Sequence, residues 1–147
     1  MIRRATTKDV AAIRGLAIES VSKDPIPVRI CKESMDETIR EALGNNHFLW
    51  VSEIDGEVVA AFGAMSQPSF WHERQTCSVM LYYTRVPGEG LKLLREFVRW
   101  FKHRPVIKVV VMELEPNTDK RMLKYLRRVG LSRISMNATY VRGLTDV

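Results

Sequence analysis

Long apolar runs, clustered cysteines, repeats and low-complexity segments are all missing from this sequence of 147 residues. No stretch reaches the roughly 18 apolar residues of a membrane span, so we expect no transmembrane helix and no membrane partner. The opening residues, MIRRATTKD, have no apolar core of the kind that secretory signal peptides carry. We therefore expect no signal peptide.

Cysteine is scarce, since Cys31 and Cys77 are the only two. They do not form the CxxC spacing of zinc sites, and two thiols are too few for a disulfide framework. We therefore predict reduced thiols, a cytoplasmic location and no metal site.

Acidic residues are outnumbered, at 17 against 23 Lys and Arg, which gives a net charge of +6. Such an excess can attract nucleic acids or phosphorylated ligands. Much of it, however, falls on a predicted helix between residues 120 and 128, as on many solvated helices. No interleaving of aromatic and basic residues accompanies it, so nucleic acid is not the predicted partner.

The share of apolar residues is 46% and the share of charged residues is 27%, which are the proportions of a globular protein. The length fits one domain that spans residues 1–147.

The most informative stretch is residues 76–117. A strand-like run ends at Arg85, a loop with two glycines follows, and an amphipathic helix opens at Leu91. In this loop Arg85, Gly88 and Gly90 fit the pattern Arg/Gln-x-x-Gly-x-Gly/Ala. Glycines between a strand and a helix let backbone N–H groups converge on phosphate oxygens, and the positive end of the helix dipole adds to the attraction. The loop therefore predicts an anion-binding site.

The rest of the chain alternates between strand and helix patterns. Capping patterns at Thr6-x-x-Asp9 and Ser34-x-x-Glu37 predict two early helices, the first of which ends at residues 23–27. Asp55-Gly56 predicts a hairpin turn. Further strands are expected at residues 2–5, 48–54, 57–65, 76–84, 106–116, 131–134 and 138–141, and a last helix ends at Gly130. This order predicts an α/β fold, a mixed central β-sheet with helices on both faces.

Four segments in this order resemble the GNAT-superfamily N-acetyltransferases over nearly the whole chain. They are residues 2–6 with Asp9, the loop at 85–90, residues 113–117, and residues 129–131. The compact form also resembles small phage-encoded GNAT-like proteins. The resemblance implies an acetyl-CoA pyrophosphate site at Arg85, Val86, Pro87, Gly88, Glu89 and Gly90.

In this family the strand before the loop splays away from its neighbour, and its free N–H groups hold the pantetheine arm and polarise the thioester carbonyl. The resemblance gives that role to the main chain of Met80, Leu81, Tyr82 and Tyr83, although an ordinary core strand would show the same residues. Asn117 corresponds to the residue that contacts the pantetheine arm, and it could also serve as a helix cap.

The proton-handling residues follow the family pattern less closely. Glu113 stands in an apolar run and is the best-placed candidate for a general base, with a structural hydrogen bond as its other reading. The family often has a general-acid Tyr where this chain has Leu126. Tyr125 lies about 100° away around the helix, so it is either a displaced acid or a packing residue. The loop residue His72, beside Phe70 and Trp71, is a further candidate for acceptor contacts.

The resulting function is an acetyl-CoA-dependent N-acetyltransferase that moves an acetyl group directly to an amine acceptor. The alternative is a non-catalytic GNAT-fold interaction protein that binds a protein partner, which Leu126 favours. The sequence leaves open whether the acceptor is a small molecule or a protein. An exposed terminal strand could also pair two chains into a homodimer.

Overall fold

The computed structural model of the chain describes residues 1–23, 26 and 29–143. Its strands are β1 (Ile2–Arg4), β2 (Phe48–Ile54), β3 (Glu57–Pro68), β4 (Gln75–Thr84) and β5 (Ile107–Val111). Its helices are α1 (Val10–Ser22), α2 (Lys32–Ala42), α3 (Glu89–Lys102) and α4 (Lys120–Arg128), and a short 3₁₀ turn, η1 (Thr7–Asp9), precedes α1. Asp24, Pro25 and Pro27, on which the predicted helix break rests, lie outside the described residues.

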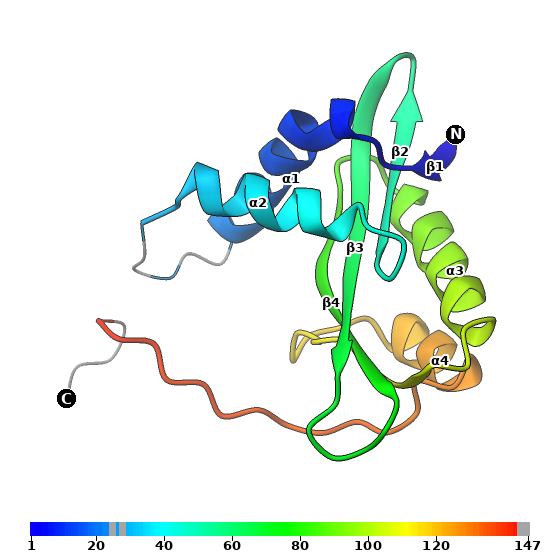
Figure 1. Ribbon diagram of the computed structural model, residues 1–147. Coiled ribbons are helices and arrows are strands. Elements are labelled where there is room, and N and C mark those ends of the chain that lie inside the picture. The colour runs from blue at the N-terminus through cyan, green and yellow to red at the C-terminus, as the bar shows by residue number, and fades with distance from the viewer. Residues whose placement is uncertain (24–25, 27–28, 144–147) are drawn as a thin grey trace.

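The strands form one five-stranded sheet in the order β1-β2-β3-β4-β5. The first four strands are antiparallel to their neighbours, and β5 runs parallel to β4. Helices α1 and α2 lie on one face of the sheet, and α3 and α4 lie on the other (Figure 1). This confirms the predicted α/β fold with a mixed central sheet and helices on both faces.

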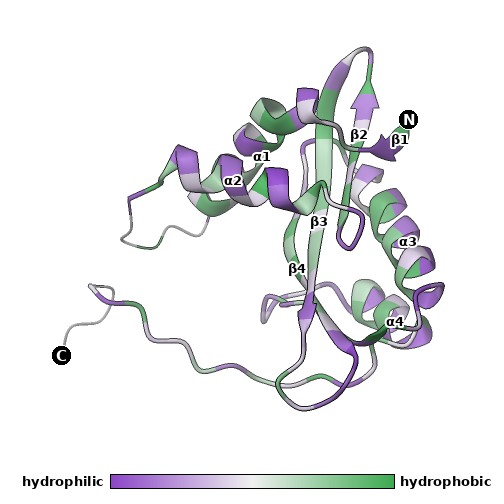
Figure 2. Ribbon diagram, viewed as in Figure 1, coloured by the Kyte–Doolittle hydropathy of each residue, from purple (hydrophilic) through white to green (hydrophobic). Residues whose placement is uncertain are grey.

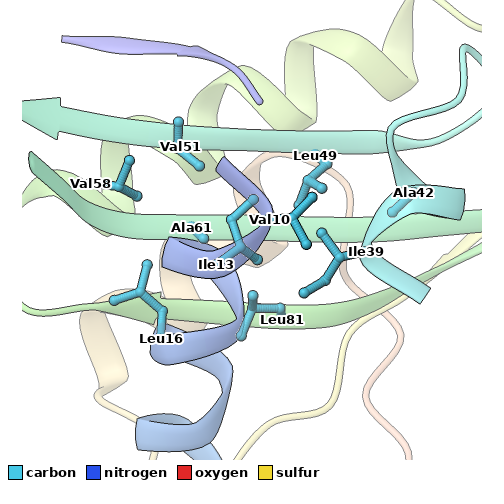
Figure 3. Packing of buried hydrophobic residues seen from close by; sticks show 10 residues of the cluster. All are labelled: Val10, Ile13, Leu16, Ile39, Ala42, Leu49, Val51, Val58, Ala61 and Leu81. Carbon is cyan, nitrogen blue, oxygen red and sulfur yellow. The ribbon is translucent and has the colours of Figure 1, made fainter. Parts of the chain in front are cut away.

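A hydrophobic core fills each side of the sheet. Figure 3 shows the first core, in which side chains of α1 and α2 pack onto β2, β3 and β4. In the second core, the ring of Phe97 on α3 lies 4.7 Å from Phe62 and 5.2 Å from Phe48. Figure 2 shows hydrophobic residues along the central strands and residues of both kinds on the helices, as helices with one buried face require.

The first predicted cap is confirmed. Thr6 accepts a hydrogen bond from the Lys8 N–H at 3.3 Å, and Asp9 accepts one from the Thr6 N–H at 2.7 Å. Asp9 is buried, and Arg3 of β1 pairs with it at 2.8 and 2.9 Å. This guanidinium holds the pKa of Asp9 below its usual value. The pair therefore ties the edge strand to the start of α1.

The second predicted cap is wrong. Helix α2 begins at Lys32, and the Met35 N–H closes its first turn on the Cys31 carbonyl at 3.1 Å. Ser34 consequently lies inside the helix, where its hydroxyl donates to the Cys31 sulfur at 3.3 Å instead of capping backbone. The hairpin at Asp55-Gly56 is confirmed, with positive φ angles of 52° and 80°.

The predictions at the C-terminal end need two corrections. The last regular strand ends at Val111 and not near residue 116, because its pairing with β4 stops at the Ser78–Val111 pair. Within the described part of the chain, the strands expected at 131–134 and 138–141 do not form. A strand exists only through bonds to a neighbour, and this segment runs outward after α4 without one (Figure 1).

Candidate functional site

The site begins where β4 loses one of its two neighbours. Along its other edge β4 pairs with β3 over its whole length, from Gln75 to Thr84. With β5 it pairs only at Gln75–Ser78. The edge of β4 that faces β5 is therefore open from Val79 onwards, which gives the splayed strand that the sequence resemblance implies.

A β-bulge lies at the point where the strands separate. Gly63 pairs with Leu81 and Ala64 pairs with Val79, so Met80 is an extra residue on β4. A Cβ atom at Gly63 would lie 2.9 Å from Cε of Met80, so the glycine leaves room for the Met80 side chain.

The alternation of the strand aims backbone donors at the open edge. The Arg85 N–H donates to the Val59 carbonyl of β3 at 2.8 Å. Successive N–H groups of a strand point to opposite edges, so those of Tyr82 and Thr84 point away from β3. A ligand beside this edge could accept hydrogen bonds from them.

The loop between β4 and α3 is held by its own residues. The Thr84 hydroxyl donates to the Val86 carbonyl at 2.6 Å and accepts from the Val86 N–H at 3.1 Å. Gly88 is the N-cap of α3 and has a φ of 88°, which favours glycine. A Cβ at Gly90 would lie 3.0 Å from Cε1 of Tyr82, so this glycine is required for the close approach of that ring.

Within the protein the two glycines have different surroundings, and neither distance tests the predicted approach of an anion. A Cβ at Gly88 would meet no protein atom within 4 Å, so within the protein it is the positive φ that favours glycine there. In the described part of the chain, the N–H groups of Gly88, Gly90 and Leu91 donate to no protein acceptor. Three free donors at the positive end of a 14-residue helix form a favourable place for an anion.

Glu89 faces away from this place. Its buried carboxylate accepts a hydrogen bond from the Ser52 hydroxyl at 2.6 Å and pairs with Lys92 at 2.8 Å. Lys92 and then Ser52 lower its pKa. Its N–H donates to the Val86 carbonyl at 3.3 Å. Glu89 therefore anchors the start of α3 to β2, and this N–H is already occupied.

Arg85 is held by carboxylates of two other elements. Its guanidinium contacts Glu19 of α1 at 2.6 and 3.0 Å and Glu57 of β3 at 3.5 Å. Arg85 lowers the pKa of Glu19. The Arg85 side chain thus holds the loop against α1. Val86 and Pro87 complete the loop and do not line either of the two cavities described below.

Two cavities follow the open edge of β4. The first has a volume of about 490 Å³, and the second has a volume of about 480 Å³. Tyr82 and Met122 line both, so the cavities adjoin. The first is further lined by Lys23, Tyr83, Thr84, Gly88, Gly90 and Leu91. The second lies between β4 and residues 112–119, where Met80 and Leu81 face Glu113, Leu114 and Glu115.

The structure brings Glu113 to the second cavity, although not from a strand. Glu113 is exposed two residues beyond the end of β5, and Glu115 lies beside it on the same wall. Asn117 is exposed in the turn that follows, between the lining residues Glu115 and Thr118. It is not the helix cap, because Asp119 accepts the Arg121 N–H at 2.8 Å and occupies that position.

Tyr82 and Tyr125 differ in their relation to the cavities, since Tyr82 lines both of them. Leu126 is 1% exposed, and Tyr125 packs into the second core with the Arg128 guanidinium 5.6 Å from its ring centre. Tyr125 is not among the residues that line the two cavities. Burial raises the pKa of Tyr82 to about 12, with a smaller contribution from Tyr125. The Tyr82 phenol is therefore neutral where it lines the first cavity.

The β3–β4 loop lies apart from both cavities. Phe70 and Trp71 are 91% and 87% exposed and contact each other edge to face. The Nδ1 atom of His72 accepts the Arg74 N–H at 3.2 Å, within the loop itself. The structure therefore does not bring His72 to the cavities.

Sequence reasoning did not name several residues of the cavity walls as site residues, among them Ser20, Lys23, Leu91, Glu115 and Met122. Lys23 and Ser20 come from the end of α1, some 60 residues before the loop, and no pattern links them to it. Met122 lies on α4, which the sequence predicts as a helix without indicating that this side chain faces a cavity. The role of the Leu91 N–H could have been predicted from its position in the first turn of the helix, because the first N–H groups of any helix lack a partner within the helix.

Comparisons with known proteins show which solved structures share this fold. No protein-family profile matches the chain, and no curated protein sequence matches it. Solved structures do match. An aminoglycoside acetyltransferase from an uncultured soil metagenomic sample aligns with 99% of this chain and 96% of its own, at 15% identity and a TM-score of 0.67.

Two further structures match in the same way. Ribosomal-protein-alanine N-acetyltransferase from Brucella melitensis covers 87% of this chain and 81% of its own, at 20% identity and a TM-score of 0.69. A predicted acetyltransferase from Clostridium acetobutylicum, solved with acetyl-CoA, covers 100% of this chain and 94% of its own, at 15% identity and a TM-score of 0.67. The chain therefore has the fold of the GNAT-superfamily acetyltransferases, as its sequence motifs indicate.

Two further properties concern the described residues. None of the helices within residues 1–23 and 29–143 combines the length and the apolar composition needed to cross a membrane. No group of three or more His, Cys, Asp or Glu side chains in the same residues is arranged to hold a metal ion.

Proposed function

We propose that this protein is an acetyl-CoA-dependent N-acetyltransferase that transfers the acetyl group directly to an amine. The observation that carries the proposal is the open edge of β4, which leads from three free N–H groups at Gly88, Gly90 and Leu91 to a cavity with two carboxylates. An elongated ligand with an anionic end fits this arrangement. Acetyl-CoA is such a ligand and supplies the activated acetyl group.

The residues of the first cavity suit the phosphate end. The free N–H groups and the dipole of α3 would hold the pyrophosphate, and the neutral Tyr82 phenol would not repel it. Lys23 stands at the mouth, with its ammonium 4.9 Å from the centre of the Tyr83 ring. This cation adds favourable charge from α1.

The residues of the second cavity suit the acceptor. The open main chain of Met80–Tyr83 would orient the thioester carbonyl, and Glu113 and Glu115 would attract a cationic amine and take its proton, directly or through water. Asn117, in the turn beside this wall, would contact the pantetheine arm. We do not assign the role of general acid to Tyr125, because its ring packs in the core. Water would then return the proton to the leaving thiolate.

The acceptor is an amine whose identity differs among proteins of this fold. The names of the matching proteins include aminoglycosides and a ribosomal-protein alanine. We propose a primary amine that carries positive charge before reaction, because both carboxylates of the second cavity would favour it.

The second candidate is a GNAT-fold interaction protein without turnover. It is favoured by Leu126, a buried side chain with no hydroxyl where the family often has its acid. This candidate also accommodates the first cavity, because a protein can bind acetyl-CoA without turning it over.

The deciding experiment has two stages. Thermal unfolding is first measured with and without acetyl-CoA, which at 100 times its dissociation constant should stabilise the fold by about 2.7 kcal/mol. Thiol release from acetyl-CoA is then followed with a panel of amines, peptides and proteins. Release in proportion to an added amine supports the enzyme. Binding without release over the panel supports the interaction protein, and the absence of any thermal shift contradicts the acetyl-CoA site.

A further inference from the structure

The positive charge of this protein is concentrated in one part of the chain. Residues 92–133 hold 12 of the 23 Lys and Arg residues but only 4 of the 17 Asp and Glu residues, so their net charge is +8. The rest of the chain, with 11 basic and 13 acidic residues, has a net charge of −2. The whole excess of +6 therefore lies in the part that contains most of α3, all of β5 and all of α4.

Many of these basic side chains lie on the outer sides of the two helices. On α3 they recur at intervals of three and four residues, which keeps them on one side of the helix. The exposed members of this stripe are Lys92, Arg95, Arg99 and Lys102. The exposed basic residues of α4 are Lys120, Arg121, Lys124, Arg127 and Arg128.

Both helices present these residues on the same side of the sheet. Side chains of α3 and α4, among them Leu94, Phe97 and Leu126, pack into the second core. The two helices cover the face of the sheet opposite α1 and α2 (Figure 1). Their basic residues consequently point away from the sheet on one side of the molecule. We call the nine exposed cations of α3 and α4 the basic face.

The chain itself neutralises little of the basic face. Lys120, Lys124 and Arg128 stand four residues apart on α4, a spacing at which like charges destabilise a helix. A bound polyanion would remove this repulsion. In the part of the chain that the structure describes, the cations of the basic face without an ion pair are Arg95, Lys102, Lys120, Lys124, Arg127 and Arg128.

The chemistry of the basic face fits phosphates better than a lipid surface. Five of the nine cations are Arg, whose planar guanidinium binds a phosphate through two hydrogen bonds. Among the described residues of α3 and α4, no large apolar side chain is exposed, so neither helix has side chains that could enter lipid. The stripe on α3 extends about 15 Å, and a B-form duplex carries about nine phosphate charges over that length.

The arrangement also indicates which nucleic acid fits. Nucleic acid is not the partner predicted from the sequence, because aromatic residues do not interleave with the basic ones. Aromatic stacking serves to bind single strands, whereas contact with the backbone of a duplex requires only charge. The grooves of B-form DNA admit an α-helix, and the major groove of A-form RNA is too narrow for one. We propose that the basic face binds the phosphate backbone of double-stranded DNA, independently of base sequence.

The test measures binding of the full chain to a short labelled DNA duplex by fluorescence anisotropy over a series of salt concentrations. With about six phosphate contacts, the logarithm of the binding constant should fall against the logarithm of the salt concentration with a slope of about −5. Arg127→Gln should weaken binding about tenfold at about 50 mM salt and reduce this slope by about 0.9. Arg95→Gln should do the same, because the basic face includes both helices.

Arg40→Gln is the matched control. Arg40 is an exposed Arg in the last turn of α2, as Arg127 is in the last turn of α4, but it lies on the other face of the sheet. This variant should bind the duplex as the unmodified protein does. Saturating acetyl-CoA should leave the duplex bound, because the anion site at Gly88–Leu91 is separate from the outer sides of the helices.

Four results would overturn the proposal. The first is no binding to the duplex at low salt, and the second is an equal loss of affinity in Arg40→Gln and Arg127→Gln. The third is displacement of the duplex by acetyl-CoA, which would place it in the loop. The fourth is tighter binding to an RNA duplex of the same sequence or to vesicles of phosphatidylcholine and phosphatidylserine. Acetyl transfer is not part of this test, so its failure would leave the proposed function untouched.

Discussion

The two edges of β4 differ, and the difference separates stability from binding. Towards β3 the strand is paired along its whole length, and Phe62 and Ala61 behind it are fully buried. Towards β5 only Gln75–Ser78 are paired. Beyond them every residue except the buried Leu81 is half-buried or exposed, as Met80 is at 38%.

This comparison teaches how one strand can serve two purposes. Hydrogen bonds to β3 hold β4 in place, so the opposite edge can remain open at no cost to the cores. The unpaired N–H groups would be a liability on a surface, but a ligand in the adjoining cavities can satisfy them. Substitutions on the two sides should therefore have separable effects.

The largest expected effect is on the paired side. Phe62→Ala removes a buried ring that lies 5.0 Å from Tyr82 and 4.7 Å from Phe97, and it should lower the free energy of unfolding by about 3–5 kcal/mol. Met80→Ala, on the open side, should cost less than about 1 kcal/mol because that side chain is exposed. Denaturant unfolding measures both, and equal costs would contradict the division between the edges.

The next effect belongs to the anion site. Gly88→Val forces a β-branched residue into a φ of 88° and adds bulk beside the free N–H groups, so acetyl-CoA should bind at least about 100-fold more weakly, or 2.7 kcal/mol. Gly130→Val is the matched control. That glycine also has a positive φ, at 105°, and open space around its Cα, but it lies at the far end of α4.

Calorimetric titration of both variants checks this prediction. The control should lose stability and keep its affinity for acetyl-CoA. If Gly88→Val binds as tightly as the unmodified protein, the loop is not the phosphate site.

A smaller effect is expected at the acceptor end. Glu113→Gln should slow acetyl transfer about tenfold at acidic pH, where hydroxide is scarce, and less at alkaline pH. The effect is below that of a buried base because Glu113 is exposed and Glu115 stands beside it. Rates of thiol release across the pH range measure it, and a pH-independent ratio of one would remove Glu113 from the reaction.

The smallest effect is expected at Tyr125. Tyr125→Phe keeps the packed ring and removes only the hydroxyl, so turnover should change less than about twofold. Loss of a hundredfold or more in turnover at unchanged stability would identify Tyr125 as the general acid and contradict its assignment to the core.

Much of the fold was predictable because its signals are local. Three of these signals each involve only a few residues, and each predicted the element that the structure has. They are the helix cap at Thr6 and Asp9, the hairpin turn at Asp55-Gly56, and the apolar stripe of α3. The pattern at Ser34 misled because the N-cap of α2 is Cys31, three residues earlier, although its side chain makes no cap hydrogen bond. The expected strands after Leu131 failed for another reason, since the alternating pattern is present and the partner strand is not.

The residues of the candidate site also divide into those that local sequence signals indicate and those that they do not. The residues of the loop could be named from the sequence, and so could Met80–Tyr83 and Glu113, because they are contiguous with a recognisable motif. The separate requirements of Gly88 and Gly90 could not be distinguished, because only the position of the Tyr82 ring decides between them. Lys23 and Ser20 could not be found at all, because α1 meets β4 only in space.

The sequence by itself determined most of the helices and strands as far as β5, where the loop glycines stand and which residues can carry charge, because periodicity and backbone preference act over a few residues. Only the tertiary structure decided that β5 leaves β4 after Ser78, that Glu89 faces Ser52, and that Tyr125 packs in the core. Those outcomes depend on which surfaces meet across the sheet, and contacts between distant parts of a chain leave no local pattern in its sequence.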